Sequence, residues 1–116
     1  MDNITQSPTY TELAEAAIEA FEAKQGIDPV MLDVESVTSL ASAFVIVSGA
    51  SHAQVKALAE HAEEHIYEKF GIKPTRVEGK GDNAWTLMDY GHVVLHIFTR
   101  EGRDFYKLDK IWKDAK

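Results

Sequence analysis

The spacing of hydrophobic residues predicts helices and strands in alternation, beginning with a helix. Apolar side chains recur there at helical spacing, at Leu13, Ala17, Ala20 and Phe21. Thr9 and Glu12 are spaced as a capping box, in which each side chain satisfies a free backbone N–H of the first turn. Gly26 can adopt the left-handed conformation that ends a helix, and Pro29 cannot continue one. We therefore expect a first helix over residues 10–25.

Two strands and a second helix follow. Residues 30–34 alternate weakly, whereas residues 43–47 form a continuous apolar run, typical of a strand covered on both faces and expected at the centre of the sheet. Ser51 and Gln54 form a second potential capping box, and Gly71 ends the helix that follows. The apolar stripe of this helix consists of Val55, Leu58, Ala59, Ala62, Ile66 and Phe70.

The last third of the chain predicts a mixed sheet and a terminal helix. Residues 75–78 are a short strand candidate, joined to the preceding strand by a right-handed parallel crossover through the second helix. Residues 85–89 and 93–98 flank a turn at Tyr90 and Gly91 and so predict an antiparallel hairpin. From Arg103 onward, Phe105, Leu108 and Trp112 recur at helical spacing. The expected fold is a single α/β domain in the order α-β-β-α-β-β-β-α, with residues 1–8 disordered.

Composition and charge restrict the partners. A chain of 116 residues with 45% hydrophobic content fits one compact domain. Twelve Lys and Arg against nineteen Asp and Glu give a net charge of -7, which argues against a broad nucleic-acid-binding face and favours a basic protein partner. The absence of cysteine excludes disulfides and thiolate catalysis. Neither a signal peptide nor a membrane span is recognisable, so we expect a cytoplasmic protein that does not bind membranes.

Two patterns suggest an enzyme. His61 and His65 belong to an H-x-x-E-H string, which occurs in inverted zinc peptidases, but no third ligand follows at suitable spacing, so exposed structural histidines are favoured. The Gly49 to Ser51 turn precedes a helix and could receive an anion, but it lacks a lysine, and no D-x-D motif accompanies it. Helix capping by Ser51 is the favoured interpretation. A small nucleotidyltransferase-like enzyme or a metal-dependent hydrolase stays as the alternative.

Neither serine hydrolysis nor general base catalysis is indicated. No G-x-S-x-G motif occurs, and His96 is in phase with Val94 and Phe98 on an apolar strand, where a hydrogen-bonded packed histidine is expected. Aromatic residues are dense in the same region, at Trp85, Tyr90, Phe105, Tyr106 and Trp112. Phe105 and Trp112 share a stripe with Leu108 and are expected in the core, whereas core and interface are equally favoured for Trp85 and Tyr90.

A composite of short strings resembles the ribosomal silencing factor (Iojap-like) family. It runs over most of the chain, from about Val30 to Trp112, and its parts come in the order and spacing of that family. The parts are Leu32-Asp33-Val34, Phe44-Val45-Ile46, Gly49-Ala50-Ser51, Glu78-Gly79, Trp85, Asp89-Tyr90-Gly91, Val93 to Phe98, Arg103, Tyr106, Leu108 and Trp112. Ser42-Ala43 and His92 stand where many relatives have an acid, and Ile111 where they have a leucine.

The resemblance implies a fold related to nucleotidyltransferases but without their catalytic carboxylates, and therefore no enzymatic activity, catalytic residue, metal or cofactor. It implies that the protein binds the large ribosomal subunit through ribosomal protein fourteen, blocks subunit association sterically and represses translation. The family's binding surface maps to Trp85 as an apolar anchor, surrounded by Glu78, Asp89, Tyr90 and Tyr106. An exposed aromatic patch could also support a homodimer of the free protein, or a homodimeric scaffold unrelated to ribosomes.

Overall fold

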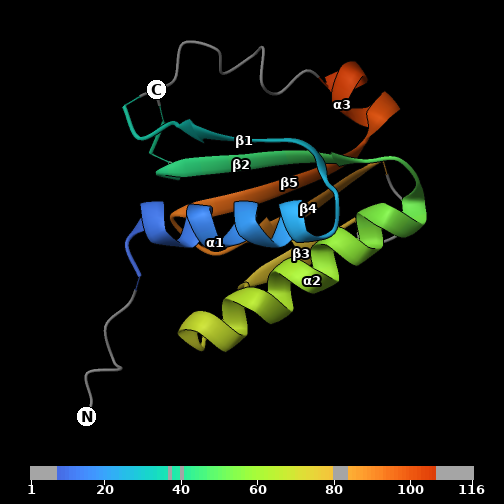
Figure 1. Cartoon of the computed structure of the whole chain (residues 1–116). Coiled ribbons are helices and arrows are strands. Elements are labelled where there is room, and N and C mark those ends of the chain that lie inside the picture. Colours follow the sequence, from blue (N-terminus) through green and yellow to red (C-terminus); the bar gives the residue numbers. More distant parts are fainter. Residues whose placement is uncertain (1–7, 37, 40, 80–83, 107–116) are drawn as a thin grey trace.

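The computed structural model describes residues 8–36, 38–39, 41–79 and 84–106. These residues form a sheet of five strands with three helices (Figure 1), in the predicted order. The elements are α1 (Tyr10–Ala23), β1 (Ile27–Asp33), β2 (Ala43–Gly49), α2 (His52–Phe70), β3 (Arg76–Glu78), β4 (Trp85–Asp89), β5 (Val93–Thr99) and α3 (Arg100–Tyr106).

The sheet is mixed, as predicted, and its strands lie in the order β1-β2-β5-β4-β3. β2 and β5 are parallel, and every other neighbouring pair is antiparallel. β3 therefore runs parallel to β2, as expected for strands joined through α2, but β5 and β4 lie between them. The central strand is β5, so the placement of the run at residues 43–47 in the centre was wrong by one strand. Both β2 and β5 are apolar on both faces. An apolar run shows that both faces of a strand are covered, but it does not show which position the strand takes in the sheet.

α1 starts as predicted and ends for a different reason. Thr9 Oγ1 accepts a hydrogen bond from the Glu12 backbone N–H (3.1 Å), and Glu12 Oε1 accepts one from the Thr9 N–H (2.9 Å), which confirms the capping box. The left-handed residue after the helix is Gln25, with φ of 62°, and not Gly26. Gly26 is needed for packing, because a Cβ atom there would lie 2.7 Å from Val47 Cγ2.

α2 carries the predicted stripe and only half of the predicted capping box. Ser51 Oγ accepts a hydrogen bond from the Gln54 backbone N–H (3.1 Å). The Gln54 side chain does not return to the Ser51 N–H, because its Oε1 accepts a hydrogen bond from the Ala50 N–H instead. Its Nε2 donates to the carbonyl oxygens of Lys24 (3.1 Å) and Gln25 (3.0 Å). Gln54 thereby joins α2 to the turn between α1 and β1. Gly71 ends the helix in the left-handed conformation, with φ of 74°.

The main core lies between the sheet and the two long helices. α1 and α2 cover one face of the sheet, called the inner face here (Figure 1). The largest fully buried side chains of this layer are Leu13, Phe21, Val45, Val47, Leu58, Ile66, Met88, Leu95 and Ile97. Each such side chain contributes about 1.5–3 kcal/mol through removal of its apolar surface from water.

α3 lies on the other side of the sheet, at the carboxyl ends of β2 and β5 (Figure 1). It begins at Arg100, three residues before the predicted start, because Thr99 Oγ1 accepts a hydrogen bond from the Gly102 N–H (2.9 Å). Arg103 Nη1 donates to the Ile27 carbonyl oxygen and to Ser48 Oγ, both at 3.1 Å, and so ties α3 to β1 and β2. The predicted continuation through Leu108 and Trp112 lies outside the described residues, as do residues 1–7 of the segment expected to be disordered.

Candidate functional site

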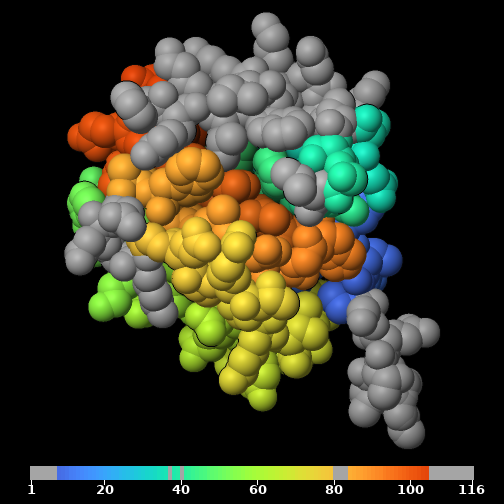
Figure 2. All heavy atoms as spheres, turned by 180° about the vertical axis from the view of Figure 1, so that it is seen from behind, coloured from blue at the N-terminus to red at the C-terminus, as the bar shows by residue number. Residues whose placement is uncertain are grey.

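The sheet face opposite α1 and α2, called the outer face here, carries a second apolar cluster. Paired residues of neighbouring strands project to the same side, so the registers of β1, β2, β5 and β4 define its members. These are Val30, Leu32, Phe44, Ile46, Trp85, Val94 and Phe98, joined by Val34 and Ala41 from the β1–β2 connection. In the view from behind (Figure 2), the atoms of the β3 to β5 region, yellow to orange, form the centre of the molecule.

Trp85 lies at the start of β4, partly exposed on the outer face. Its ring stacks on Phe98, with ring centroids 5.2 Å apart and an interplanar angle of 29°. The indole Nε1–H donates a hydrogen bond to Nδ1 of His96 at 3.0 Å. Trp85 therefore has an apolar face held by a core residue and a polar edge that is satisfied within the protein, while part of the side chain remains in solvent.

His96 is the buried polar residue at the middle of this cluster. Only 4% of its surface is exposed, in agreement with the prediction of a packed, hydrogen-bonded histidine. Burial lowers the pKa of His96 to about 4, so the imidazole is neutral at pH 7. The contact between His96 and Trp85 was not predicted. The loop over residues 90–92 sets the register of β4 against β5, and this register places the two side chains on the same face of neighbouring strands.

The two acidic residues of the candidate site share one cation. Glu78 and Asp89 lie on neighbouring strands, and Arg76 contacts both, with Nε 3.1 Å from Glu78 Oε2 and Nη2 3.9 Å from Asp89 Oδ2. Asp89 Oδ1 also accepts a hydrogen bond from the Gly91 N–H (2.8 Å). The formal charge of the three side chains is -1, so the local potential is weaker than two free carboxylates would give. No sequence motif marks Arg76 as part of this site.

Tyr90 does not lie beside Trp85. Side chains alternate along β4, so Trp85 faces outward while Tyr90, five positions on, packs into the inner core and is 8% exposed. Burial, with the nearby Glu63 carboxylate as a smaller cause, raises the pKa of Tyr90 above its usual range. Tyr106 is the last residue given for α3. Its side chain lies outside the described part of the structure.

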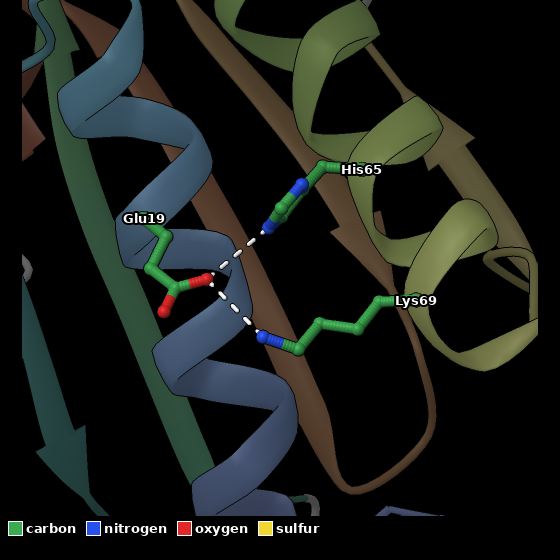
Figure 3. Close-up of polar contacts among 3 residues, drawn as sticks. All are labelled: Glu19, His65 and Lys69. Carbon is green, nitrogen blue, oxygen red and sulfur yellow. Dashed lines mark hydrogen bonds and ion pairs between the residues drawn. The ribbon is translucent and has the colours of Figure 1, made fainter.

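Of the two histidines in the H-x-x-E-H string on α2, His65 takes part in a contact with α1. His65 Nε2 lies 3.2 Å and Lys69 Nζ 3.4 Å from the same oxygen, Oε1 of Glu19 on α1 (Figure 3). The hydrogen bond from His65 and then the contacts with Lys69 lower the pKa of Glu19. His61 stacks on His65 at 6.1 Å between ring centroids. Within the described ranges, no group of three or more His, Asp or Glu side chains is arranged to hold a metal ion.

The turn from Gly49 to Ser51 is engaged in local structure. Ser51 caps α2, and Gln54 Oε1 accepts a hydrogen bond from the Ala50 N–H. A Cβ atom on Gly49 would lie 3.0 Å from the backbone nitrogen of Val55, so glycine here allows the strand to approach the helix closely. Capping and packing therefore account for the residues that suggested a nucleotide site.

Comparison with known proteins decides the family. Residues 7–116 match the family described as ribosomal silencing factor during starvation. The chain belongs to this family. The ribosomal silencing factor RsfS of Halalkalibacterium halodurans is 36% identical over 104 residues, which cover 90% of this chain and 88% of the relative. That of Bacillus subtilis is 36% identical over 99 residues, covering 85% and 83%.

Two solved structures have the same fold as this member of the silencing factor family. A crystal structure of a protein from Chromobacterium violaceum superposes with a TM-score of 0.86 at 33% identity, covering 91% of this chain and 88% of that one. A crystal structure from Bacillus halodurans gives 0.77 at 32% identity, covering 88% and 94%. The predicted single α/β domain with a mixed sheet is confirmed, and membership of the silencing factor family makes the chain a regulator of translation. No helix among the described residues is long and apolar enough to cross a membrane.

Proposed function

We propose that the protein represses translation by binding the large ribosomal subunit through ribosomal protein fourteen and sterically blocking its association with the small subunit. The family match over residues 7–116 carries the proposal, since relatives that share most of the chain are named ribosomal silencing factors. The protein acts in the cytoplasm by occupying space, and no bond is made or broken.

Engaged polar groups support binding rather than catalysis. His65 is held by Glu19, and the Gly49 to Ser51 turn is used for capping and close packing. A metal site at His61 and His65 would need a third ligand, and no such cluster occurs among the described residues. The function proposed here needs only a surface of suitable shape and charge.

The outer edge of the sheet around Trp85 supplies a surface suited to a basic protein. Trp85 offers a partly exposed ring with a fixed orientation, and tryptophan is enriched among residues that carry binding energy at interfaces. Glu78 and Asp89 lie at the β3 edge, where the side chain of Glu78 is 57% exposed. A cationic group of the partner would compete with Arg76 for these two carboxylates. In the proposal Trp85, Glu78 and Asp89 meet the partner directly, while Tyr90 supports the strand from within. Tyr106 is included on the family resemblance alone.

The deciding experiment is a subunit-joining assay. Purified large subunits are sedimented with the protein to measure binding, and small subunits are then added. We expect co-sedimentation with the large subunit and a reduced yield of joined particles. Full joining at saturating protein would contradict the proposal. Self-association without co-sedimentation would favour a homodimeric scaffold instead.

Replacement of Trp85 by alanine tests the proposed surface. Trp85→Ala should leave the domain folded and weaken large-subunit binding about 30-fold, since truncation of an anchoring tryptophan costs about 2 kcal/mol or more. The matched control is Tyr67→Ala, which removes an aromatic ring that is 50% exposed on α2, away from the outer face. Equal affinities for wild type and Trp85→Ala, with a folded variant, would remove Trp85 from the interface.

A further inference from the structure

The hydrogen bond between Trp85 and His96 determines where the proton of the imidazole lies. An indole N–H can only donate, so Nδ1 of His96, 3.0 Å from Trp85 Nε1, must accept. A neutral imidazole carries one proton, which must then be on Nε2. Trp85 therefore selects one of the two neutral tautomers of His96.

Aromatic rings hold the imidazole in this position. Phe44 on β2 meets His96 edge to face, with ring centroids 4.7 Å apart and an angle of 71°. On β5, the Phe98 ring is nearly parallel to the imidazole at 6.5 Å, and Trp85 on β4 lies at 5.7 Å. None of these three neighbours is charged. The buried imidazole therefore remains neutral at pH 7, and its Nδ1 lone pair stays available.

The same hydrogen bond removes a rotational freedom from Trp85. Stacking on Phe98 alone would allow the indole to turn over by about half a turn and still stack, because stacking is insensitive to which edge of the ring points outward. Only one of these orientations puts Nε1–H against Nδ1 of His96. The imidazole thus distinguishes two ring orientations that packing does not.

The hydrogen-bonded pair of Trp85 and His96 is less favourable for stability than two apolar side chains at the same positions would be. Nε2 of His96 is buried and has no hydrogen-bond partner within the described part of the protein. An unpartnered buried donor is destabilising, whereas two apolar side chains could fill a similar volume without one. The pair therefore has a use other than filling the outer cluster.

We propose that His96 is a positioning residue, which fixes the indole of Trp85 in the single orientation that meets the partner. The inference rests on the proposed function, because it takes Trp85 as a side chain that contacts the partner. Pre-ordering of an anchor reduces the conformational entropy lost on binding. His96 itself does not touch the partner in this mechanism.

Two substitutions separate positioning from packing. Asn has an oxygen on the same γ carbon that bears Nδ1 in histidine, so His96→Asn can keep an acceptor for Trp85, while His96→Leu keeps apolar volume and removes the acceptor. The Trp85 indole N–H signal, assigned with Trp85→Phe, reports the bond by its hydrogen-exchange rate. We expect slow exchange in wild type and His96→Asn, and exchange about 10-fold faster in His96→Leu.

Binding to large subunits is measured with the same variants. We expect His96→Leu to weaken binding about 5-fold and His96→Asn to bind within about 2-fold of wild type. Wild-type affinity in His96→Leu, when Trp85→Ala does weaken binding, would overturn the positioning role and leave the proposed surface intact. Wild-type affinity in Trp85→Ala would overturn both. The two failures are therefore distinguishable.

A measurement on the wild-type protein keeps the test decisive if His96→Leu does not fold. Protonation of Nδ1 removes the acceptor, so the Trp85 indole N–H resonance should move on acidification with a midpoint near pH 4. A resonance that keeps its position while the ¹⁵N signals of His96 show protonation of the imidazole in the folded protein would show that Nδ1 does not accept the bond, and the inference would fall.

Discussion

At the scale of single residues, the buried imidazole of His96 links the acid stability of the protein to its outer face. The folded state holds His96 neutral because burial lowers its pKa to about 4, whereas an unfolded chain gives histidine a pKa of about 6.5. Between these values the unfolded state binds more protons than the folded state. Stability must therefore rise with pH through this interval.

This difference predicts a pH-dependent contribution to unfolding. The contribution of the neutral His96 to the free energy of unfolding is fully present above about pH 6.5 and is lost as the pH falls toward 4. The whole loss over this interval is about 3 kcal/mol. Urea denaturation of wild type and His96→Asn at several pH values measures it. The free energy of unfolding of wild type should fall more steeply below pH 6.5 than that of the variant. Parallel curves would contradict a neutral buried His96.

At the scale of elements, α3 depends on tertiary anchors. Its seven described residues are held to the rest of the domain by two side-chain contacts. The N–H of Gly102 is held by Thr99, and Arg103 reaches β1 and β2. Gly102 also lies against Ala84, the residue before β4, where an added Cβ would clash with the Ala84 carbonyl oxygen and lie 2.9 Å from Ala84 Cβ.

Gly102→Ala should therefore destabilise the protein, although the same change stabilises most helices. The helix propensity of alanine favours the variant by about 1 kcal/mol. The clash involves backbone, which cannot move cheaply, and we expect a net loss of about 1–3 kcal/mol. Asp104→Ala, in the same helix at an exposed position, is the control and should be within about 0.5 kcal/mol of wild type. Urea denaturation gives both values, and a Gly102→Ala variant as stable as the control would refute the close contact.

At the scale of the whole molecule, several of the acidic side chains behind the net negative charge lie close together on α2. Glu60, Glu63 and Glu64 line a shallow hollow of about 310 Å³ together with Tyr67 and Lys73. This hollow is distinct from the outer face, so its carboxylates influence a basic partner through the long-range field. Such a field acts mainly on the rate of encounter.

The proposed association with a basic protein should therefore be salt-dependent in its association rate. Raising the ionic strength from about 0.05 M to about 0.5 M should lower the association rate constant with purified ribosomal protein fourteen by about 10-fold, because the Debye length shortens. The dissociation rate constant should change less, since buried contacts are screened less. Stopped-flow mixing measures both constants. An association rate independent of salt would exclude electrostatic steering.

The sequence by itself determined the features that depend on local spacing. The capping box at Thr9 and Glu12, the stripe of α2 and the hairpin of β4 and β5 were predicted, because caps, helical periodicity and turns involve residues a few positions apart. The prediction that Trp85 and Tyr90 share one binding surface did not take into account the alternation along β4, which gives the two side chains opposite directions. The composite of family strings indicated the family, which the comparisons confirmed.

Only the tertiary structure decided which face of the sheet the long helices cover. That choice buries Tyr90 in the inner core and leaves Trp85 outside, and alternation alone cannot make it. The central rank of β5, the close contact of Gly26 with Val47 and the bond between Trp85 and His96 likewise join distant positions. Such contacts arise from the packing of whole elements, and this packing has no period along the chain.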